Sequence, residues 1–149
     1  MAQIRITKEF SFEAAHMLKD YDGLCKNIHG HSYRLAVTVT GQTIEDAGSP
    51  KLGMVMDFGD LKKIVNENIV NVYDHALVVN ESESADKKLH LKSTTAKLIF
   101  TAFQPTCENM VADFARVISE KLPSHLTLFS IRLYETANSY AEWHAIDNT

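Results

Sequence analysis

The sequence predicts an α+β fold in which an antiparallel sheet carries two amphipathic helices on one face. Apolar and polar residues alternate over residues 4–16, over residues 29–40 and again near the C-terminus, which is typical of strands with one buried face. Apolar residues recur at helical spacing over residues 59–72 and 106–122. The 149 residues contain no internal repeat or linker, so we expect a single domain over residues 1–149.

The first two strands are expected to form a hairpin that brings histidines together. In residues 4–16 the even positions are mostly apolar, and His16 ends that face. The second strand, residues 29–40, begins with His29 and His31, which share its apolar face because residues two apart in a strand point the same way. The end of one strand then lies beside the start of the other, so His16 approaches His29 and His31.

Capping residues and prolines mark the ends of the other elements. Asp57 or Asp60 is placed to cap the first helix, and Thr106 is placed to cap the second, which Pro123 ends. Residues 80–93 are polar and have no period, so we expect a surface loop there. The remaining predicted elements are short strands at residues 54–58 and 97–103 and two final strands at residues 129–135 and 139–145.

Composition excludes several classes of protein. The formal net charge of −4 provides no basic face for nucleic acid or an anionic membrane. No apolar run approaches the roughly 18 residues of a transmembrane helix, and the N-terminus has no secretory pattern. We therefore expect a cytoplasmic protein in which Cys25 and Cys107 are reduced thiols.

The three histidines predict a metal site. His29 and His31 are spaced about 6–7 Å apart along a strand, within reach of one ion. Zinc is the natural metal for neutral imidazoles, and His16, His29 and His31 would leave a fourth position open, as in catalytic sites. Cys25 as a fourth ligand would instead make a closed, structural site, and spacing alone does not decide between the two.

Other residues could complete an active site. A nearby cation favours the thiolate of Cys25, which would make it a usable base. Asp74 beside His75 could fix the tautomer of that imidazole. Glu135 ends an apolar strand face, where it would either form a buried ion pair or recognise a ligand with adjacent N–H donors, such as a guanine-like ring. Glu108 could simply favour the N-terminus of the second helix.

These residues occur within ordered motifs that resemble one known family over nearly the whole chain. The motifs are Phe12-Glu13-Ala14-Ala15-His16, Cys25-x-x-x-His29-Gly30-His31, Asp57-Phe58, Asp74-His75, Pro105-Thr106-Cys107-Glu108-Asn109 and Tyr134-Glu135-Thr136. The chain resembles the 6-pyruvoyltetrahydropterin synthase and 6-carboxytetrahydropterin synthase family. The resemblance implies a tunnelling fold, in which each subunit pairs a four-stranded antiparallel sheet with two helices. Three such sheets would join into a barrel, and two trimers would form a homohexamer.

The resemblance also implies roles for individual residues. His16, His29 and His31 would bind Zn²⁺, and Cys25 would be the general base with Asp74 and His75, from a neighbouring subunit, as its relay. Glu135 would anchor the pterin, and Thr106 and Glu108 would lie near it. The implied substrate is 7,8-dihydroneopterin triphosphate.

The Cys-x-x-x-His-Gly-His spacing resembles the carboxy branch of that family. We therefore expect a zinc-dependent carbon–carbon lyase that yields 6-carboxy-5,6,7,8-tetrahydropterin, acetaldehyde and triphosphate, on the route to 7-deazaguanine compounds and queuosine. The alternatives are a 6-pyruvoyltetrahydropterin synthase, which eliminates triphosphate without C–C cleavage, and a non-catalytic pterin-binding or zinc-binding protein.

Overall fold

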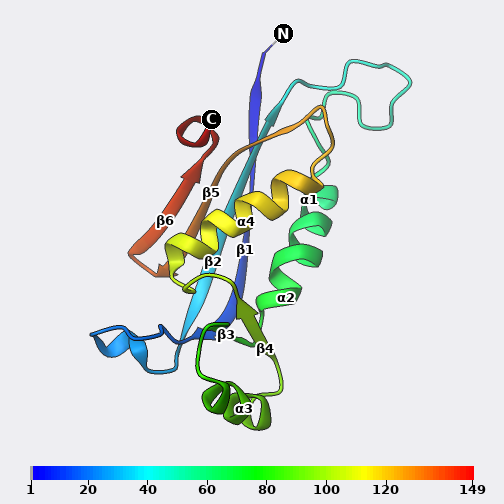
Figure 1. Ribbon diagram of the computed structural model, residues 1–149. Helices are drawn as coiled ribbons and strands as arrows, with labels where there is room; N and C mark the ends of the chain where they lie inside the picture. The colour runs from blue at the N-terminus through cyan, green and yellow to red at the C-terminus, as the bar shows by residue number, and fades with distance from the viewer. Residues whose placement is uncertain (1) are drawn as a thin grey trace.

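The computed structural model describes residues 2–149, apart from the side chain of Cys25 (Figure 1). Its strands are β1 (Ile4–His16), β2 (His29–Gly41), β3 (Ala76–Asn80), β4 (Leu98–Thr101), β5 (Thr127–Thr136) and β6 (Ser139–His144). Its helices are α1 (Phe58–Val65), α2 (Asn71–Tyr73), α3 (Ala85–Thr94) and α4 (Cys107–Lys121), with the π-helical η2 (Asn66–Val70) and the 3₁₀ segments η1 (Leu24–Lys26) and η3 (Ala145–Asn148).

The strands form one mixed sheet of six strands in the order β4-β3-β1-β2-β5-β6. The strands β1, β2, β5 and β6 are antiparallel neighbours, as the alternating sequence predicts. Two short parallel strands, β3 and β4, extend the sheet beyond the four strands that the family resemblance implies, and β3 pairs with β1 only over Ala14–His16. Strand β4 confirms the short strand predicted within residues 97–103. The α+β class is confirmed, and the sheet is larger than predicted.

The two predicted helices begin at the predicted caps. Asp57 accepts a hydrogen bond from the Gly59 N–H at 2.6 Å, and α1, η2 and α2 then continue without a break to Tyr73. Thr106 accepts from the Asn109 N–H at 3.2 Å at the start of α4. Both helical stretches cover the same face of the sheet (Figure 1).

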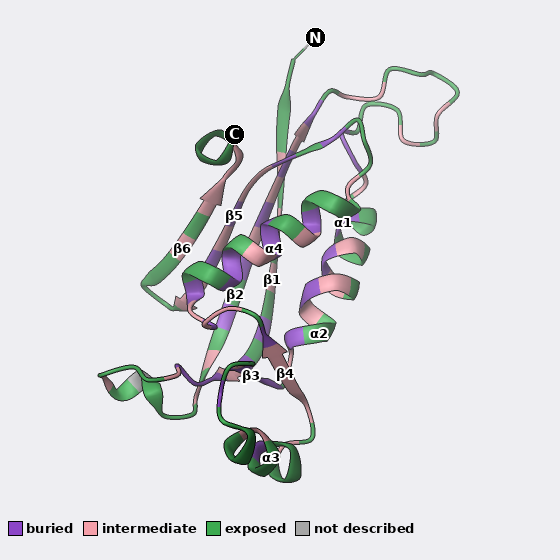
Figure 2. Cartoon of the chain, in the orientation of Figure 1, coloured by how far each residue is buried: buried purple, intermediate pink, exposed green. Residues whose placement is uncertain are grey.

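The core lies between that sheet face and the helices (Figure 2). The fully buried Phe114 of α4 meets the rings of Phe12 and Tyr73 in edge-to-face contacts, with centroids 6.3 and 4.9 Å apart. Hydrophobic burial of this kind is the main force that holds the helices on the sheet.

Two local predictions are wrong. Residues 54–58 form no strand, because the chain there leads directly into α1. Residues 80–93 are not only a loop, since α3 begins within them after the Ser84 cap. Leu91 of α3 packs in a small second core with Met17, Leu77 and Val79, so tertiary contact stabilises a helix whose own sequence has no apolar stripe.

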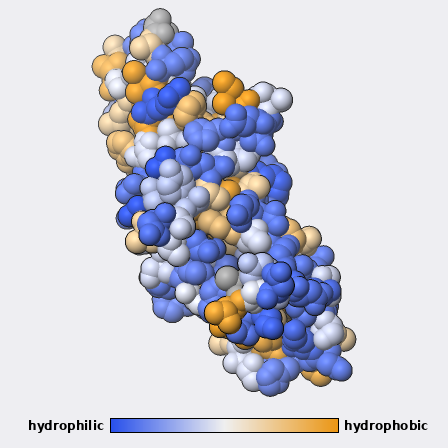
Figure 3. Space-filling view, turned by 90° about the vertical axis from the view of Figure 1, so that its left-hand side faces the viewer, coloured by the Kyte–Doolittle hydropathy of each residue, from blue (hydrophilic) through white to orange (hydrophobic). Residues whose placement is uncertain are grey.

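No helix among residues 2–149 is long and apolar enough to cross a bilayer. The face seen in Figure 3 is largely hydrophilic, with separate apolar patches.

Candidate functional site

Three imidazoles converge where β1 ends and β2 begins. The register pairs His16 with His29 and Ala14 with His31, as the hairpin prediction requires. The ring centroids lie 4.5 Å apart for His16 and His29, 5.1 Å for His16 and His31, and 4.9 Å for His29 and His31. One ligand nitrogen from each ring lies within 4.8 Å of the others, so the three could hold one metal ion.

Backbone carbonyls fix the orientation of two of the rings. Nδ1 of His16 lies 2.7 Å from the carbonyl oxygen of Pro105, and Nδ1 of His29 lies 2.7 Å from that of Asn27. Carbonyls only accept, so both Nδ1 atoms carry a proton, and in the neutral rings both Nε2 atoms present lone pairs. Outer hydrogen bonds of this kind commonly orient metal-ligating histidines.

The Nε2 atoms of His16 and His29 face each other at 3.0 Å. Two lone pairs at this distance repel unless a cation lies between them. A tetrahedral ion with bonds of about 2.0–2.1 Å would separate two ligand nitrogens by about 3.3 Å, close to the observed spacing. The donor set therefore fits a zinc-like ion.

His31 supplies the third nitrogen. Its Nε2 is buried and has no hydrogen-bond partner among the described residues. The nearest acidic group is Glu135, whose Oε1 lies 3.7 Å from this nitrogen. A buried, unpaired nitrogen is costly, and a bound metal ion would satisfy it.

Burial also favours the metal-binding form of the imidazoles. Burial lowers the pKa of His16 below its ordinary value, although the hydrogen bond to Pro105 opposes this effect. Burial likewise lowers the pKa of His31, against the opposing charge of Glu135. A lower pKa favours the neutral ring, which is the form that binds zinc.

A cavity of about 340 Å³ lies beside His16. It brings together four predicted site residues, His16, Thr106, Glu108 and Glu135. Tyr21, Cys107 and Tyr140 also line it, along with Leu18, Ser139 and Ala141. The size and the convergent polar groups suit a small bicyclic ligand.

Cys107 is a buried, neutral thiol in this wall. Burial raises its pKa to about 11. Its Sγ donates to the carbonyl oxygen of Leu133 at 3.2 Å, which ties the start of α4 to β5. This geometry fits the packing role that the sequence predicts for it.

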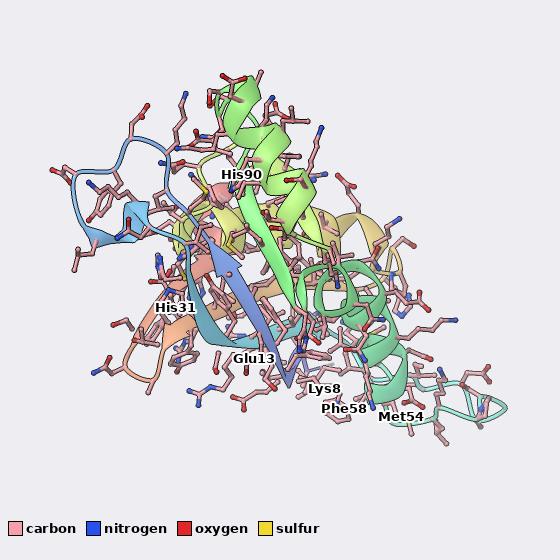
Figure 4. The ribbon with its side chains drawn as sticks, turned by 90° about the horizontal axis from the view of Figure 1, so that it is seen from below. Lys8, Glu13, His31, Met54, Phe58 and His90 are labelled. Carbon is pink, nitrogen blue, oxygen red and sulfur yellow. The ribbon has the colours of Figure 1, made fainter. Side chains whose placement is uncertain are left out.

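Asp74 and His75 lie elsewhere within this chain. His75 lines a second groove of about 380 Å³. Glu13 and His31, which are labelled in Figure 4, line the same groove. Asp74 Oδ2 lies 2.9 Å from His75 Nδ1, and its Oδ1 accepts from the Glu13 N–H at 2.9 Å. The hydrogen bond from the Glu13 N–H has the largest effect on the pKa of Asp74, followed by the one from His75. Together they hold the pKa of this carboxyl below its usual range.

The Asp74–His75 pair is therefore preorganised but exposed. His75 has a left-handed backbone with φ of 62°, and its N–H donates to the Glu13 carbonyl oxygen at 2.6 Å. The side chain of His75 is 79% exposed, so a second surface could approach it. The Cys25 side chain lies outside the described part of the chain, and its predicted role stays a prediction.

Sequence reasoning missed several groups around the histidines. The carbonyls of Pro105 and Asn27 are backbone atoms that no residue pattern reveals. Tyr33 is buried with its ring centroid 5.5 Å from that of His31, and Tyr21 and Tyr140 come to the cavity from distant segments. Only the strand alternation that places Tyr33 two residues after His31 gave any signal.

Comparison with known proteins identifies the family. The model of the family described as 6-pyruvoyl tetrahydropterin synthase matches residues 5–145. The chain belongs to the 6-pyruvoyl tetrahydropterin synthase family. This confirms the resemblance seen in the ordered motifs.

Two similar proteins are named 6-carboxy-5,6,7,8-tetrahydropterin synthase. The 6-carboxy-5,6,7,8-tetrahydropterin synthase of Haemophilus influenzae is 36% identical over 143 aligned residues, and the match covers 93% of this chain and 97% of that protein. The protein of the same name from Synechocystis is 36% identical over 138 residues, covering 93% of this chain and 91% of its own.

Solved structures share the fold of this 6-pyruvoyl tetrahydropterin synthase family member. The Plasmodium falciparum 6-pyruvoyl tetrahydropterin synthase superposes with a TM-score of 0.71 at 19% identity, covering 97% of this chain and 98% of its own. The Caenorhabditis elegans enzyme of that name gives 0.66 at 24% identity, with 97% of both chains covered.

Proposed function

We propose that this protein is a zinc-dependent 6-carboxytetrahydropterin synthase. It would convert 7,8-dihydroneopterin triphosphate and water to 6-carboxy-5,6,7,8-tetrahydropterin, acetaldehyde and triphosphate. The observation that carries the proposal is the convergence of His16, His29 and His31 beside a cavity that also holds Glu135, in a chain 36% identical to a protein of that name. The reaction would serve 7-deazaguanine and queuosine synthesis in the cytoplasm, with residues 1–149 as one pterin-binding domain.

Binding and orientation would be divided among residues of the cavity. Glu135 lines the cavity and approaches His31, and its carboxylate could accept two adjacent N–H donors of a pterin ring there. Thr106 and Glu108 line the same cavity at the start of α4 and would fix the ring's position. His16, His29 and His31 would hold zinc, which supplies Lewis-acid polarisation of the hydroxyls on the substrate side chain.

Proton removal from the side-chain carbon would fall to Cys25. Asp74 holds His75 in one tautomer, and the exposed imidazole could stabilise the Cys25 thiolate of a neighbouring subunit. Proton transfer by Cys25 would let the pterin ring gain two electrons while the substrate side chain is oxidised and its C–C bond is cleaved.

A free sheet edge supports a homo-oligomer, proposed here as a hexamer of two trimers. Strand β3 covers only Ala14–His16 of β1, so residues 4–13 of β1 pair on that side with no strand in the described part of the chain. Ile4, Met54 and Phe58 are 41%, 42% and 51% exposed beside this edge and line one cavity. Unpaired edges next to apolar patches invite pairing with another copy.

Steady-state assays with 7,8-dihydroneopterin triphosphate and purified, zinc-loaded protein test the proposal. The expected result is release of acetaldehyde and triphosphate in equal amounts. Triphosphate without acetaldehyde would indicate the 6-pyruvoyl branch. No turnover by protein that binds zinc and a pterin would favour a non-catalytic binding protein.

A further inference from the structure

Gln104 joins two chain segments that carry the candidate site, and the proposed mechanism does not use it. It lies between β4 and α4, directly before Pro105. Its side-chain Oε1 accepts hydrogen bonds from the Lys19 N–H at 3.1 Å and from Asn80 Nδ2 at 3.2 Å, and its Nε2 donates to the Lys19 carbonyl oxygen at 2.8 Å. One amide thus satisfies both backbone groups of Lys19.

The backbone of Gln104 fixes the other side of the junction. Its carbonyl oxygen accepts from the Thr106 N–H at 2.8 Å and from Asn109 Nδ2 at 2.9 Å. These bonds shape the turn from which the buried Pro105 presents its carbonyl oxygen to His16 Nδ1. The turn is therefore held from α4 on one side and from the Lys19 segment on the other.

The two segments that Gln104 joins both contribute residues to the lining of the cavity. Leu18 and Tyr21 line it from the segment that follows β1, and Thr106 lines it from the start of α4. Lys19 comes three residues after His16, so the amide of Gln104 connects the chain beyond this histidine to the carbonyl that orients its ring.

We propose that Gln104 is a positioning residue that clamps the segment after β1 to the turn before α4 and so holds the Pro105 carbonyl against His16. This inference rests on the proposed function only in taking the three histidines as metal ligands. A neutral amide suits the position, because the junction needs one acceptor for two N–H donors and one donor for a carbonyl.

Replacing Gln104 should weaken metal binding without changing the ligands. Loss of an outer partner of a metal-ligating histidine commonly costs about 10–100-fold in affinity, and Gln104 acts one residue away through Pro105, so about 10-fold is expected for Gln104→Ala. Gln104→Glu keeps an acceptor for Lys19 but loses the donor and places a carboxylate against a carbonyl, so a loss of the same sign is expected.

The test measures Co²⁺ affinity of the metal-free full-length protein at 25 °C from the visible absorption of the bound ion. Gln42→Ala, an exposed glutamine in the loop after β2, is the matched control and should bind Co²⁺ like the wild type. Circular dichroism establishes that each variant is folded, and Gln104→Glu is the variant to use if Gln104→Ala does not fold.

Folded Gln104 variants with wild-type Co²⁺ affinity would overturn the inference, even if their unfolding temperature falls, since that result marks a merely structural role. A lower affinity with an unchanged absorption spectrum supports it, because the ligands stay and only their orientation loosens. The proposed function fails separately, when wild-type protein with normal metal affinity does not produce acetaldehyde.

Discussion

Replacing His31 with leucine should separate the stability of the metal-free protein from its response to zinc. The buried Nε2 of His31 has no hydrogen-bond partner among the described residues, and such a group costs about 1–3 kcal/mol of folding free energy. Leucine fills a similar volume without a polar atom. The 3.7 Å approach to Glu135 is lost, but a partly exposed pair is worth only about 0–1 kcal/mol.

The net result for the metal-free protein is a gain of about 1 kcal/mol. For a chain of this size, that gain raises the midpoint of thermal unfolding by about 2–4 °C. Zinc should reverse the order, because a ligand at 100 times its Kd stabilises the native state by about 2.7 kcal/mol, and His31→Leu removes one of the three candidate ligands.

Thermal unfolding followed by circular dichroism, with a chelator and then with zinc at 100 times the wild-type Kd, measures both effects. His90→Leu, on the exposed surface of α3, is the matched control and should change stability by less than about 0.5 kcal/mol. The reasoning is refuted if the metal-free His31→Leu variant is less stable than the metal-free wild type, or if zinc stabilises the variant as much as it stabilises the wild type.

Three further predictions concern Cys25, the buried histidines and the core residue Phe114. Cys25→Ala should abolish turnover while zinc content and assembly survive; a fully active variant rules out the base, and loss of zinc indicates a fourth ligand. Burial lowers the pKa values of His16 and His31, so as pH falls the unfolded chain binds protons at these histidines before the native protein does. Above about pH 6.5 the two histidines leave the free energy of unfolding of the metal-free protein unchanged. Below that pH the free energy of unfolding falls by up to about 1.4 kcal/mol per pH unit for each histidine. Urea unfolding between pH 5.5 and 7.5 measures this, and a flat profile contradicts it. Phe114→Ala should cost about 3–5 kcal/mol, since the ring is fully buried against Phe12, and urea unfolding that shows less than about 1 kcal/mol would mean that the core rearranges.

The long elements were predictable because their residue patterns match their surroundings. Strand β1 runs over the predicted residues 4–16, and the alternation together with the expected hairpin brings His16 close to His29, with which it is paired in the sheet. The caps Asp57 and Thr106 are local hydrogen bonds within a few residues, so their signal lies in the sequence nearby.

The elements that depend on distant contacts were not predictable. Helix α3 has no apolar stripe and is held by Leu91 against a second core that β1 and β3 build. Strand β4 was predicted, within residues 97–103, but its place in the sheet was not. The parallel strands β3 and β4 pair over only a few residues, which is too short a pattern to reveal the order of the sheet.

In the candidate site, too, some groups could be predicted from the sequence and others could not. Motif residues such as His16, Glu135 and Thr106 were named from the sequence and lie together in one cavity. The roles of the Pro105 carbonyl and the Gln104 amide were not predicted from the sequence. A backbone acceptor has no side-chain pattern, and a glutamine in a loop is ordinarily exposed to solvent.

The most direct test of the proposed function is mass spectrometry of the products that purified, zinc-loaded protein forms from 7,8-dihydroneopterin triphosphate without an added reductant. The account predicts 6-carboxy-5,6,7,8-tetrahydropterin together with acetaldehyde. A 6-pyruvoyl product, or unchanged substrate with zinc bound, would contradict it.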